Sequence, residues 1–199
     1  EILKRLGRPY ADGLHHLSYG MIDLPSGKMK SREGTVVDAD DLIAETIEEA
    51  KASARESGMI SELSQNEQNE IFRKVGLGAL KFFIIKVNPQ KRMTFDPTQS
   101  VDMQGQTGPY VQNAYVRINS ILGKIDVSDL ADCSTYELSA IEKGLLGQVS
   151  SFPSIIEEAA NQYDPSGVAN YCFAVAKSYH RFYHDHSILK AESEEAKSF

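Results

Sequence analysis

From residue 38 onward, apolar side chains recur every three or four positions, the spacing that lines one face of an α-helix. Helices are predicted to begin near Asp40, at Ser64 and at Pro109, residue types that suit the first turn of a helix. Asp164-Pro165 predicts the start of a last long helix. Two sequences with capping-box spacing predict the helices between them, at Ser134…Glu137 and Ser154…Glu157. The pattern therefore predicts a bundle of five or six helices.

The first 37 residues lack this pattern. They are rich in Gly and Pro and contain one strand-like run, residues 16–22, which ends at the turn signal Leu24-Pro25-Ser26-Gly27. Residues 90–108 are predicted to form a loop between two helices. We therefore expect a small α/β or irregular N-terminal piece in front of the helical bundle.

The composition is that of an ordinary folded protein, with 199 residues, 41% hydrophobic and 25% charged. No apolar run is long enough to span a bilayer, so we expect no membrane partner. The two cysteines, Cys133 and Cys172, lack zinc-site spacing, which favours a reducing compartment and no protein-bound metal. The chain begins at Glu1 without a methionine or a signal peptide, so we expect a piece of a longer protein.

The net charge of −7 normally argues against a nucleic-acid partner, but the charge is segregated along the chain. Residues 71–124 carry eight basic and two acidic side chains, whereas residues 35–70 carry two and ten. Residues 125–199 are acidic again, with five basic and twelve acidic side chains. The basic segment is either a solvated helix surface or a local binding surface for a polyanion, and charge alone leaves both open.

A short loop between Gly27 and Gly34 places Lys28, Lys30 and Arg32 within five residues. Three cations that cannot relieve one another's repulsion favour a multiply charged anion, and phosphate oxygens are the natural partner. The loop lacks the spacing of a Walker loop. On composition alone, an ordinary solvated basic turn remains the alternative.

The order of short motifs along the chain narrows these alternatives. The basic loop resembles the KMSK-type loop of class I aminoacyl-tRNA synthetases, and the wider context closely resembles the arginyl-tRNA synthetase family. The resemblance covers nearly the whole chain and rests on His16-x-x-x-Gly20-Met21, Lys28-Met29, Ser31-Arg32-x-Gly34-Thr35, Val75-Gly76-x-Gly78-Ala79-Leu80-Lys81, Phe95-Asp96, Thr107-Gly108-Pro109-Tyr110-x-Gln112-x-Ala114-Tyr115-x-Arg117 and Phe182-Tyr183-His184.

The resemblance implies a fold that is mainly α: a DALR-type helical anticodon-binding bundle preceded by the last part of a Rossmann-like class I catalytic domain. Residues 1–60 would be the C-terminal part of that catalytic domain, with the KMSK-like loop. Residues 61–199 would be the α-helical anticodon-binding domain, truncated at its C-terminus. The family's HIGH motif and arginine pocket would lie upstream, so we expect the chain to be inactive alone.

The resemblance also implies the chemistry of arginine–tRNA ligase, which joins arginine and ATP as arginyl-adenylate and transfers the arginine to tRNA(Arg). Lys28 would stabilise the departing pyrophosphate, with Lys30 and Arg32 in support. Lys30 and Ser31 stand where the family usually has a serine and a second lysine. ATP is the expected cofactor, as a substrate, with Mg²⁺ on the nucleotide rather than in a protein site. The predicted ATP-binding residues are His16, Gly20, Met21, Lys28, Met29 and Ser31.

In the bundle, Tyr110 and Arg117 lie two helical turns apart and would present a ring and a guanidinium on one face. The resemblance assigns these two residues and Asn113 to tRNA binding, with Arg181 and Tyr183 as further candidates. On pattern alone, Tyr110 is equally consistent with the rim of a hydrophobic core. His180 and His184 are spaced for one helix face, but no further ligand completes a metal site.

We expect the partners to be tRNA(Arg), arginine and ATP, and we expect a cytoplasmic monomer. The alternative function is a non-catalytic all-α protein-interaction module whose basic helix is a solvated surface. Within the synthetases, the cysteinyl family shares this bundle but fits the Gly108-Pro109-Tyr110-x-Gln112 stretch less well.

Overall fold

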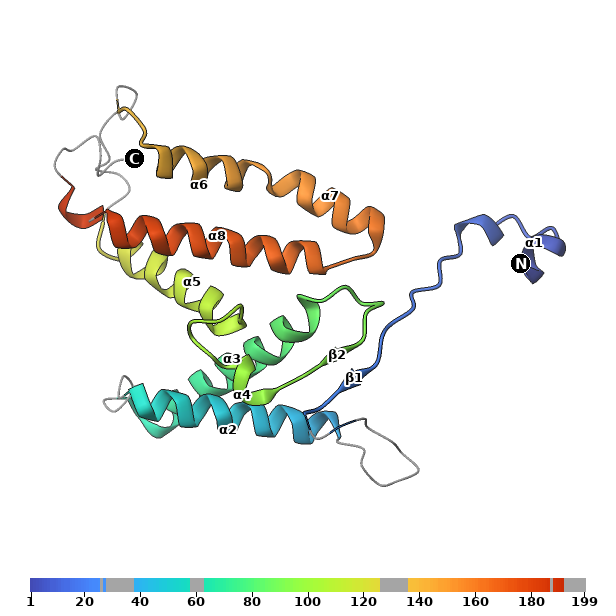
Figure 1. Ribbon diagram of the computed structural model, residues 1–199, viewed down its shortest axis with the longest axis horizontal. Helices are drawn as coiled ribbons and strands as arrows, with labels where there is room; N and C mark the ends of the chain where they lie inside the picture. The colour runs from blue at the N-terminus through green and yellow to red at the C-terminus, as the bar shows by residue number, and fades with distance from the viewer. Residues whose placement is uncertain (26, 28–37, 58–62, 126–135, 187, 192–199) are drawn as a thin grey trace.

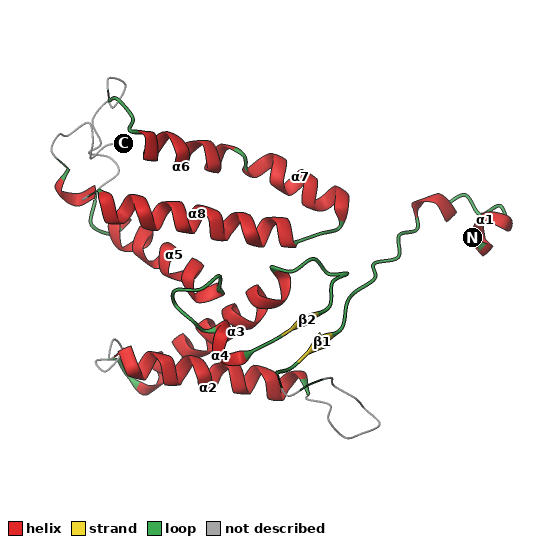
Figure 2. Cartoon of the chain, viewed as in Figure 1, coloured by secondary structure: helices red, strands yellow, loops and turns green. Residues whose placement is uncertain are grey.

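The computed structural model describes residues 1–25, 27, 38–57, 63–125, 136–186 and 188–191. Within these residues the protein is mainly helical, as predicted, with a single pair of two-residue strands (Figure 2). The elements in chain order are α1 (Ile2–Arg5), η1 (Ala11–Gly13), β1 (Ile22–Asp23), α2 (Ala39–Ser57), α3 (Gln65–Ile85), β2 (Met93–Thr94), α4 (Pro97–Ser100), α5 (Gly108–Leu122), α6 (Ala140–Ser150), α7 (Phe152–Gln162), α8 (Ser166–Asp185) and η4 (Ile188–Lys190).

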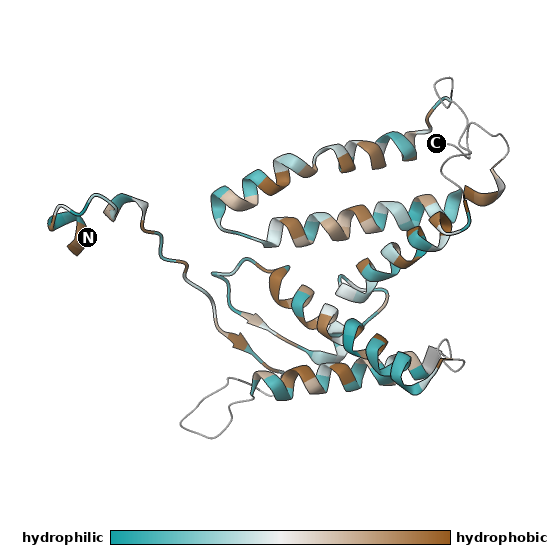
Figure 3. Ribbon diagram, turned by 180° about the vertical axis from the view of Figure 1, so that it is seen from behind, coloured by the Kyte–Doolittle hydropathy of each residue, from teal (hydrophilic) through white to brown (hydrophobic). Residues whose placement is uncertain are grey.

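The long helices form two packed groups joined by α5 (Figure 1). In one group α2 packs along α3, with a buried cluster of Ala50, Ala79 and Val101. In the other group α6 and α7 lie along α8, and α5 crosses α8 at a cluster of Ala114, Ala176 and Tyr179. Apolar and polar residues alternate along the helices (Figure 3), as expected where only one face of a helix is packed.

Two glycines, Gly76 of α3 and Gly108 of α5, explain how α3 and its neighbours approach so closely. A Cβ on Gly76 would lie 2.9 Å from the backbone of Ile47, at the crossing of α2 and α3. A Cβ on Gly108, the first residue of α5, would lie 2.3 Å from the carbonyl oxygen of Gly78. Real Cβ contacts are essentially never this short, so Gly76 and Gly108 each allow a close approach to α3, one from α2 and one from α5.

The N-terminal segment runs away from the helices and meets them along β1 (Figure 1). The predicted strand over residues 16–22 was wrong in extent, because only Ile22 and Asp23 pair, in parallel with Met93 and Thr94. The partner strand β2 lies in the predicted 90–108 loop and was missed. A parallel strand depends on a partner distant in sequence, so local periodicity cannot reveal a two-residue pair.

Helix starts were predicted with mixed success. Ser64 and Glu67 form the predicted capping box of α3, and Pro109 lies in the first turn of α5. Of the box predicted at Ser134…Glu137, Ser134 lies outside the described residues and Glu137 is not helical. The helix α6 begins at Ala140, with a box formed by Ser139 and Glu142. The box predicted at Ser154…Glu157 was wrong, because α7 already begins at Phe152.

Candidate functional site

The predicted ATP-side residues occupy the extended segment before β1. His16 and Met21 are exposed, and the Met21 carbonyl oxygen accepts a hydrogen bond from the Met93 N–H at 3.1 Å. Gly20 donates its N–H to the carbonyl oxygen of Pro89 at 2.6 Å. A Cβ on Gly20 would lie 2.1 Å from the Lys91 carbonyl oxygen, so glycine is required here by packing whatever its role toward ATP.

A bidentate ion pair fixes β1 against β2. The Arg92 guanidinium donates through Nη2 to Asp23 Oδ1 at 2.8 Å and through Nε to Asp23 Oδ2. Such a fork-to-carboxylate pair defines one relative position of the two strands. The basic loop follows β1 directly, and its predicted site residues lie outside the described residues: Lys28, Met29, Lys30, Ser31 and Arg32.

The start of α5 is held in place from several sides. The Thr107 side chain caps the helix by accepting the Tyr110 N–H at 3.3 Å and donates its hydroxyl to the Asp102 carbonyl oxygen. Pro109 is fully buried, and Gln112 donates its amide to the Lys74 carbonyl oxygen at 3.0 Å. The helix that carries the predicted residues Tyr110, Asn113 and Arg117 is therefore fixed at its N-terminal end.

Arg117 and Tyr183 are brought together by the crossing of α5 and α8. The Arg117 guanidinium carbon lies 5.0 Å from the centre of the Tyr183 ring. Its Nη1 also lies 3.0 Å from Nδ1 of His180, three residues before Tyr183 on the same helix. Arg117 is half-buried and Tyr183 is 40% exposed, so the pair lies at the surface. The cation and the ring thus form one polar and aromatic platform.

Tyr110 is half-buried at the edge of the α5–α8 cluster, in line with the alternative that placed it at the rim of a hydrophobic core. Its ring packs against Phe173 at 5.1 Å and edge-on against His180 at 4.7 Å between ring centres. The ring that accompanies Arg117 is therefore Tyr183, from the other helix, rather than Tyr110. Asn113 is half-buried on α5, one turn before Arg117.

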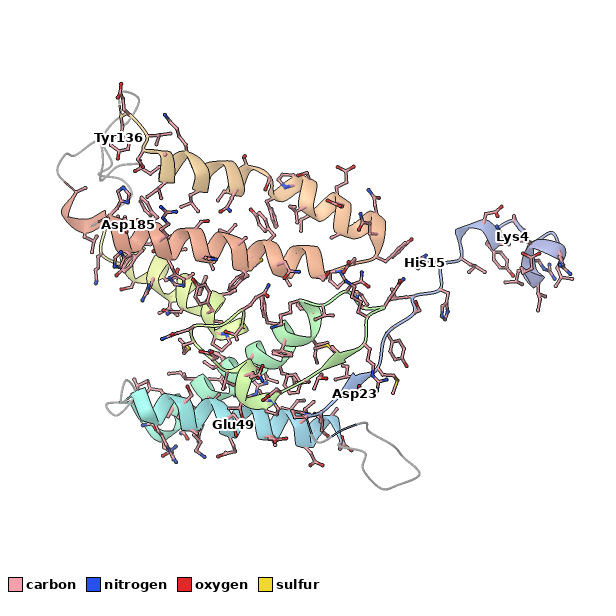
Figure 4. The ribbon with its side chains drawn as sticks, in the orientation of Figure 1. Lys4, His15, Asp23, Glu49, Tyr136 and Asp185 are labelled. Carbon is pink, nitrogen blue, oxygen red and sulfur yellow. The ribbon has the colours of Figure 1, made fainter. Side chains whose placement is uncertain are left out.

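Arg181 is exposed but paired. Its Nε lies 3.8 Å from Asp185 Oδ2, and His184 Nδ1 lies 2.9 Å from the other carboxylate oxygen of Asp185 (Figure 4). The hydrogen bond from His184 is the main reason that the pKa of Asp185 lies below its usual value. The carboxylate reduces the local positive charge of Arg181, which makes it a weaker anion contact than Arg117.

His180 is the residue of this region that the sequence did not single out for RNA binding. Its Nδ1 faces Arg117, and its Nε2 lies 3.3 Å from the Tyr110 carbonyl oxygen. Burial lowers the pKa of its imidazole, and the Arg117 charge adds to that effect. The available signal was its place three residues before Tyr183, which puts both side chains on one face of α8.

A polar junction ties α8 to the end of α3. Asn170 donates to the Lys86 carbonyl oxygen at 3.0 Å, and Gln106 donates to Asn170 Oδ1 at 2.7 Å. Asn88 donates to Asp164 Oδ2 at 2.6 Å, next to the start of α8. These bonds set the position of α8 relative to the segment that carries β2.

Metal and membrane sites find no support in the part of the chain that the structure describes. Those residues contain no group of three or more His, Cys, Asp or Glu side chains that could hold a metal ion. No helix among them is both long enough and apolar enough to cross a bilayer.

Known families match both parts of the chain. The description "tRNA synthetases class I (R), catalytic domain" matches residues 1–96, and "DALR anticodon binding domain" matches residues 111–198. Among curated relatives, the arginine–tRNA ligase of Bacteroides fragilis is 48% identical over the whole chain, which covers 34% of that relative. The arginine–tRNA ligase of Phocaeicola vulgatus is also 48% identical, with 33% of its length covered.

Solved structures agree with these matches. The arginyl-tRNA synthetase of Thermus thermophilus superposes with a TM-score of 0.85 and 27% identity, over 98% of this chain and 33% of that one. The enzyme of Plasmodium falciparum shares the fold, with a TM-score of 0.70 and 21% identity over 92% of this chain and 30% of that one. The chain thus spans about a third of the length of the relatives that it matches. From its N-terminal motifs to its last long helix, the chain belongs to the arginyl-tRNA synthetase family.

Proposed function

We propose that the chain is part of an arginine–tRNA ligase and supplies its ATP-side loop and its tRNA-binding helices. The observation that carries the proposal is the order of the two matches: a class I catalytic description over residues 1–96, then an anticodon-binding description over residues 111–198. The same order favours the synthetase over a non-catalytic interaction module, because such a module needs no nucleotide-binding part.

The ATP-side chemistry is the reaction that the family resemblance implies. The arginine carboxylate attacks the α-phosphorus of ATP, the bond to the bridging oxygen breaks, and pyrophosphate leaves with the developing negative charge. A cation at that position stabilises the transition state more than the ground state and so accelerates the step. Lys28 has this role in our proposal, with Lys30 and Arg32 contacting the same phosphates. His16, Gly20, Met21, Met29 and Ser31 line the nucleotide, and Mg²⁺ is carried on its phosphates.

The tRNA-side chemistry is supported by the α5–α8 platform. Single-stranded RNA loops are bound by stacking of unpaired bases on aromatic rings beside cations that hold the backbone. Arg117 and Tyr183 offer this pair at the surface, with Asn113 as a hydrogen-bonding side chain one turn away. Tyr110 and Arg181 remain predicted contacts, the first half-buried and the second paired with Asp185. The ligand of this face is the anticodon loop of tRNA(Arg).

Three further properties belong to the proposal. The longer protein acts as a monomer, and it acts in the cytoplasm with the rest of the translation machinery. The catalytic part ends near residue 60, and the bundle occupies residues 61–199; proteolytic mapping of stable fragments tests this boundary.

The test compares the 199-residue chain with the longer protein that contains it. Arginine-dependent exchange of pyrophosphate into ATP is expected from the longer protein and not from the chain alone, which lacks one wall of the site in our proposal. The chain alone is expected to bind a tRNA(Arg) transcript with an affinity that falls steeply with salt. The assignment would be overturned if pyrophosphate exchange into ATP by the longer protein depended on cysteine instead of arginine. It would also be overturned if the 199-residue chain had no affinity for tRNA.

A further inference from the structure

The Arg117 guanidinium is held by α8 before any ligand arrives. One of its N–H groups donates to His180 Nδ1 at 3.0 Å, and its carbon lies 5.0 Å from the Tyr183 ring centre. Free arginine side chains carry about 2 kcal/mol of rotamer entropy, which is lost when they bind in one geometry. An arginine that is already ordered loses less entropy on binding. His180 uses one of the five N–H donors of Arg117, and the structure shows no hydrogen bond from the other four to the residues that it describes.

The two contacts of His180 are satisfied together by one form of its ring. A guanidinium can only donate, so Nδ1 must be the accepting, unprotonated nitrogen. The neutral ring then carries its proton on Nε2, which lies 3.3 Å from the Tyr110 carbonyl oxygen and donates to it. The direction of the His180 pKa, below its usual value, agrees with a ring that stays neutral.

Among the described groups that contact the His180 ring, Arg117 is the charged one. From α5 the ring faces Arg117 and the Tyr110 backbone, and on α8 itself it lies near the Tyr179 ring, at 6.1 Å between centres. Glu142 of α6 lies near His186, beyond the next turn of α8, and Asp185 pairs with Arg181 and His184. Among the described residues no carboxylate forms an ion pair with Arg117, so its charge is held by a neutral acceptor and not neutralised.

We propose that His180 is a positioning residue for tRNA binding, which holds the Arg117 guanidinium beside Tyr183 so that a preorganised cation and ring face the RNA. The inference rests on the proposed tRNA-binding function and adds a residue to it. His180 acts through Arg117: its neutral nitrogen positions the guanidinium and leaves the positive charge uncompensated. A carboxylate in the same place would also position the guanidinium, but it would cancel the charge that attracts the RNA phosphates. His180 differs in this from Asp185, which holds Arg181.

The test measures binding of a tRNA(Arg) transcript to the full 199-residue chain at pH 8, where the lowered pKa of His180 keeps its ring neutral. Arg117→Ala is expected to weaken binding about 10-fold, and His180→Leu about 3- to 5-fold. His180→Asn is expected to stay within about 2-fold of the unsubstituted chain, because the amide oxygen can accept from Arg117 near the Nδ1 position. His184→Leu, the same change one turn later, is the control and leaves the Arg117 contact intact.

A double-substitution cycle separates positioning from a structural effect. If His180 acts through Arg117, His180→Leu adds less than about 2-fold once Arg117→Ala is present. The inference is overturned if His180→Leu weakens binding as much in the Arg117→Ala variant as in the unsubstituted chain. It is also overturned if Arg117→Ala binds weakly while His180→Leu binds as tightly as the unsubstituted chain. Unchanged binding by Arg117→Ala overturns the proposed RNA contact itself. If His180→Leu does not fold, ¹⁵N NMR of the unsubstituted chain decides: a ring protonated on Nε2 supports the inference, and one protonated on Nδ1 contradicts it.

Discussion

The N-terminal segment and the α5–α8 pair carry the two halves of the predicted function, and they hold their residues in different ways. In residues 1–21 nearly every large apolar side chain is exposed, with Tyr19 at 83% and Ile2 at 76%, and Ala11 is the buried one. In α5 and α8, Ala114, Ala176 and Tyr179 are buried in one cluster, and the surface residues above it contact one another. The Arg117–Tyr183 contact therefore lies within the described residues, whereas the described part of the predicted ATP side is held by the pairing of β1 with β2, by the Arg92–Asp23 ion pair and by the Gly20 N–H.

This difference shows why the two halves need different experiments. A contact formed by side chains of two packed helices is already in place and can be measured by binding to the chain. A catalytic loop acts only when the other walls of the site are present, so its test requires turnover by the longer protein.

The largest expected effect concerns the ATP side. Lys28→Ala in the longer protein should lower arginine-dependent pyrophosphate exchange by about 10²–10³-fold, because the leaving pyrophosphate loses a charged partner. Affinity for the tRNA(Arg) transcript should stay nearly unchanged, since the loop is far in sequence from α5 and α8. Equal losses of pyrophosphate exchange and of tRNA affinity would contradict the separate roles of the two regions.

A smaller effect is expected from the helix crossing that positions the tRNA side. Gly108→Ala should lower the free energy of unfolding by about 1–3 kcal/mol, because the new Cβ would meet the Gly78 carbonyl oxygen at 2.3 Å. Gly144→Ala is the matched control in α6, where a Cβ meets nothing within 4 Å, and should stabilise the protein by about 0.5–1 kcal/mol. Urea unfolding measures both changes in the free energy of unfolding. If the two variants changed it in the same direction, the packing role of Gly108 would be contradicted.

An acid-sensitive contribution is expected from the buried end of α6. Burial alone raises the pKa of the Glu142 carboxyl, but hydrogen bonds from Ser139 and Tyr136 outweigh it, and the pKa lies below its usual 4.5 (Figure 4). The folded state therefore binds fewer protons than the unfolded state, so this contribution is present above pH 4.5 and is lost as the pH falls below it. Urea unfolding between pH 3 and pH 7 should show a weaker acid dependence for Glu142→Gln than for the unsubstituted chain.

The smallest effect concerns selectivity among RNAs. The acidic residues of 35–70 flank the basic segment, and we expect them to restrict RNA to the α5–α8 face. Replacing Glu45, Glu48 and Asp41 of α2 by Gln or Asn should raise affinity for an unrelated RNA a few-fold at low salt while leaving tRNA(Arg) nearly unchanged. A filter-binding titration at two salt concentrations measures the affinities for tRNA(Arg) and for the unrelated RNA. An unchanged affinity for the unrelated RNA would contradict the selectivity role of these acidic residues.

The sequence predicted the elements whose signals are local. The cap at Ser64 and the proline-led start of α5 are confirmed, because each depends on residues within one turn. The Ser-x-x-Glu pattern failed at Ser154 because the spacing alone does not say which serine begins the helix, and Phe152-Pro153 begins α7 earlier.

Contacts between segments that are distant in the sequence could not be predicted from local sequence patterns. β2 exists only because β1 lies beside it, and His180 matters only because Arg117, 63 residues earlier, reaches it. Seven-residue spacing placed Tyr110 and Arg117 on one face of α5, and both are half-buried. Their contacts depend on α8, because the Tyr110 ring packs against Phe173 while Arg117 lies beside Tyr183. The family resemblance supplied the candidate residues, and the helix crossing supplied their grouping.

The central claim is that this acidic chain binds tRNA through a positively charged platform of α5 and α8. The most direct measurement is the salt dependence of tRNA(Arg) transcript binding by the chain and by its Arg117→Ala variant. We predict a steep fall of affinity with salt for the chain, and a slope of log Kd against log salt that is smaller by about one in the variant. Salt-insensitive binding, or identical slopes for both proteins, would contradict the claim.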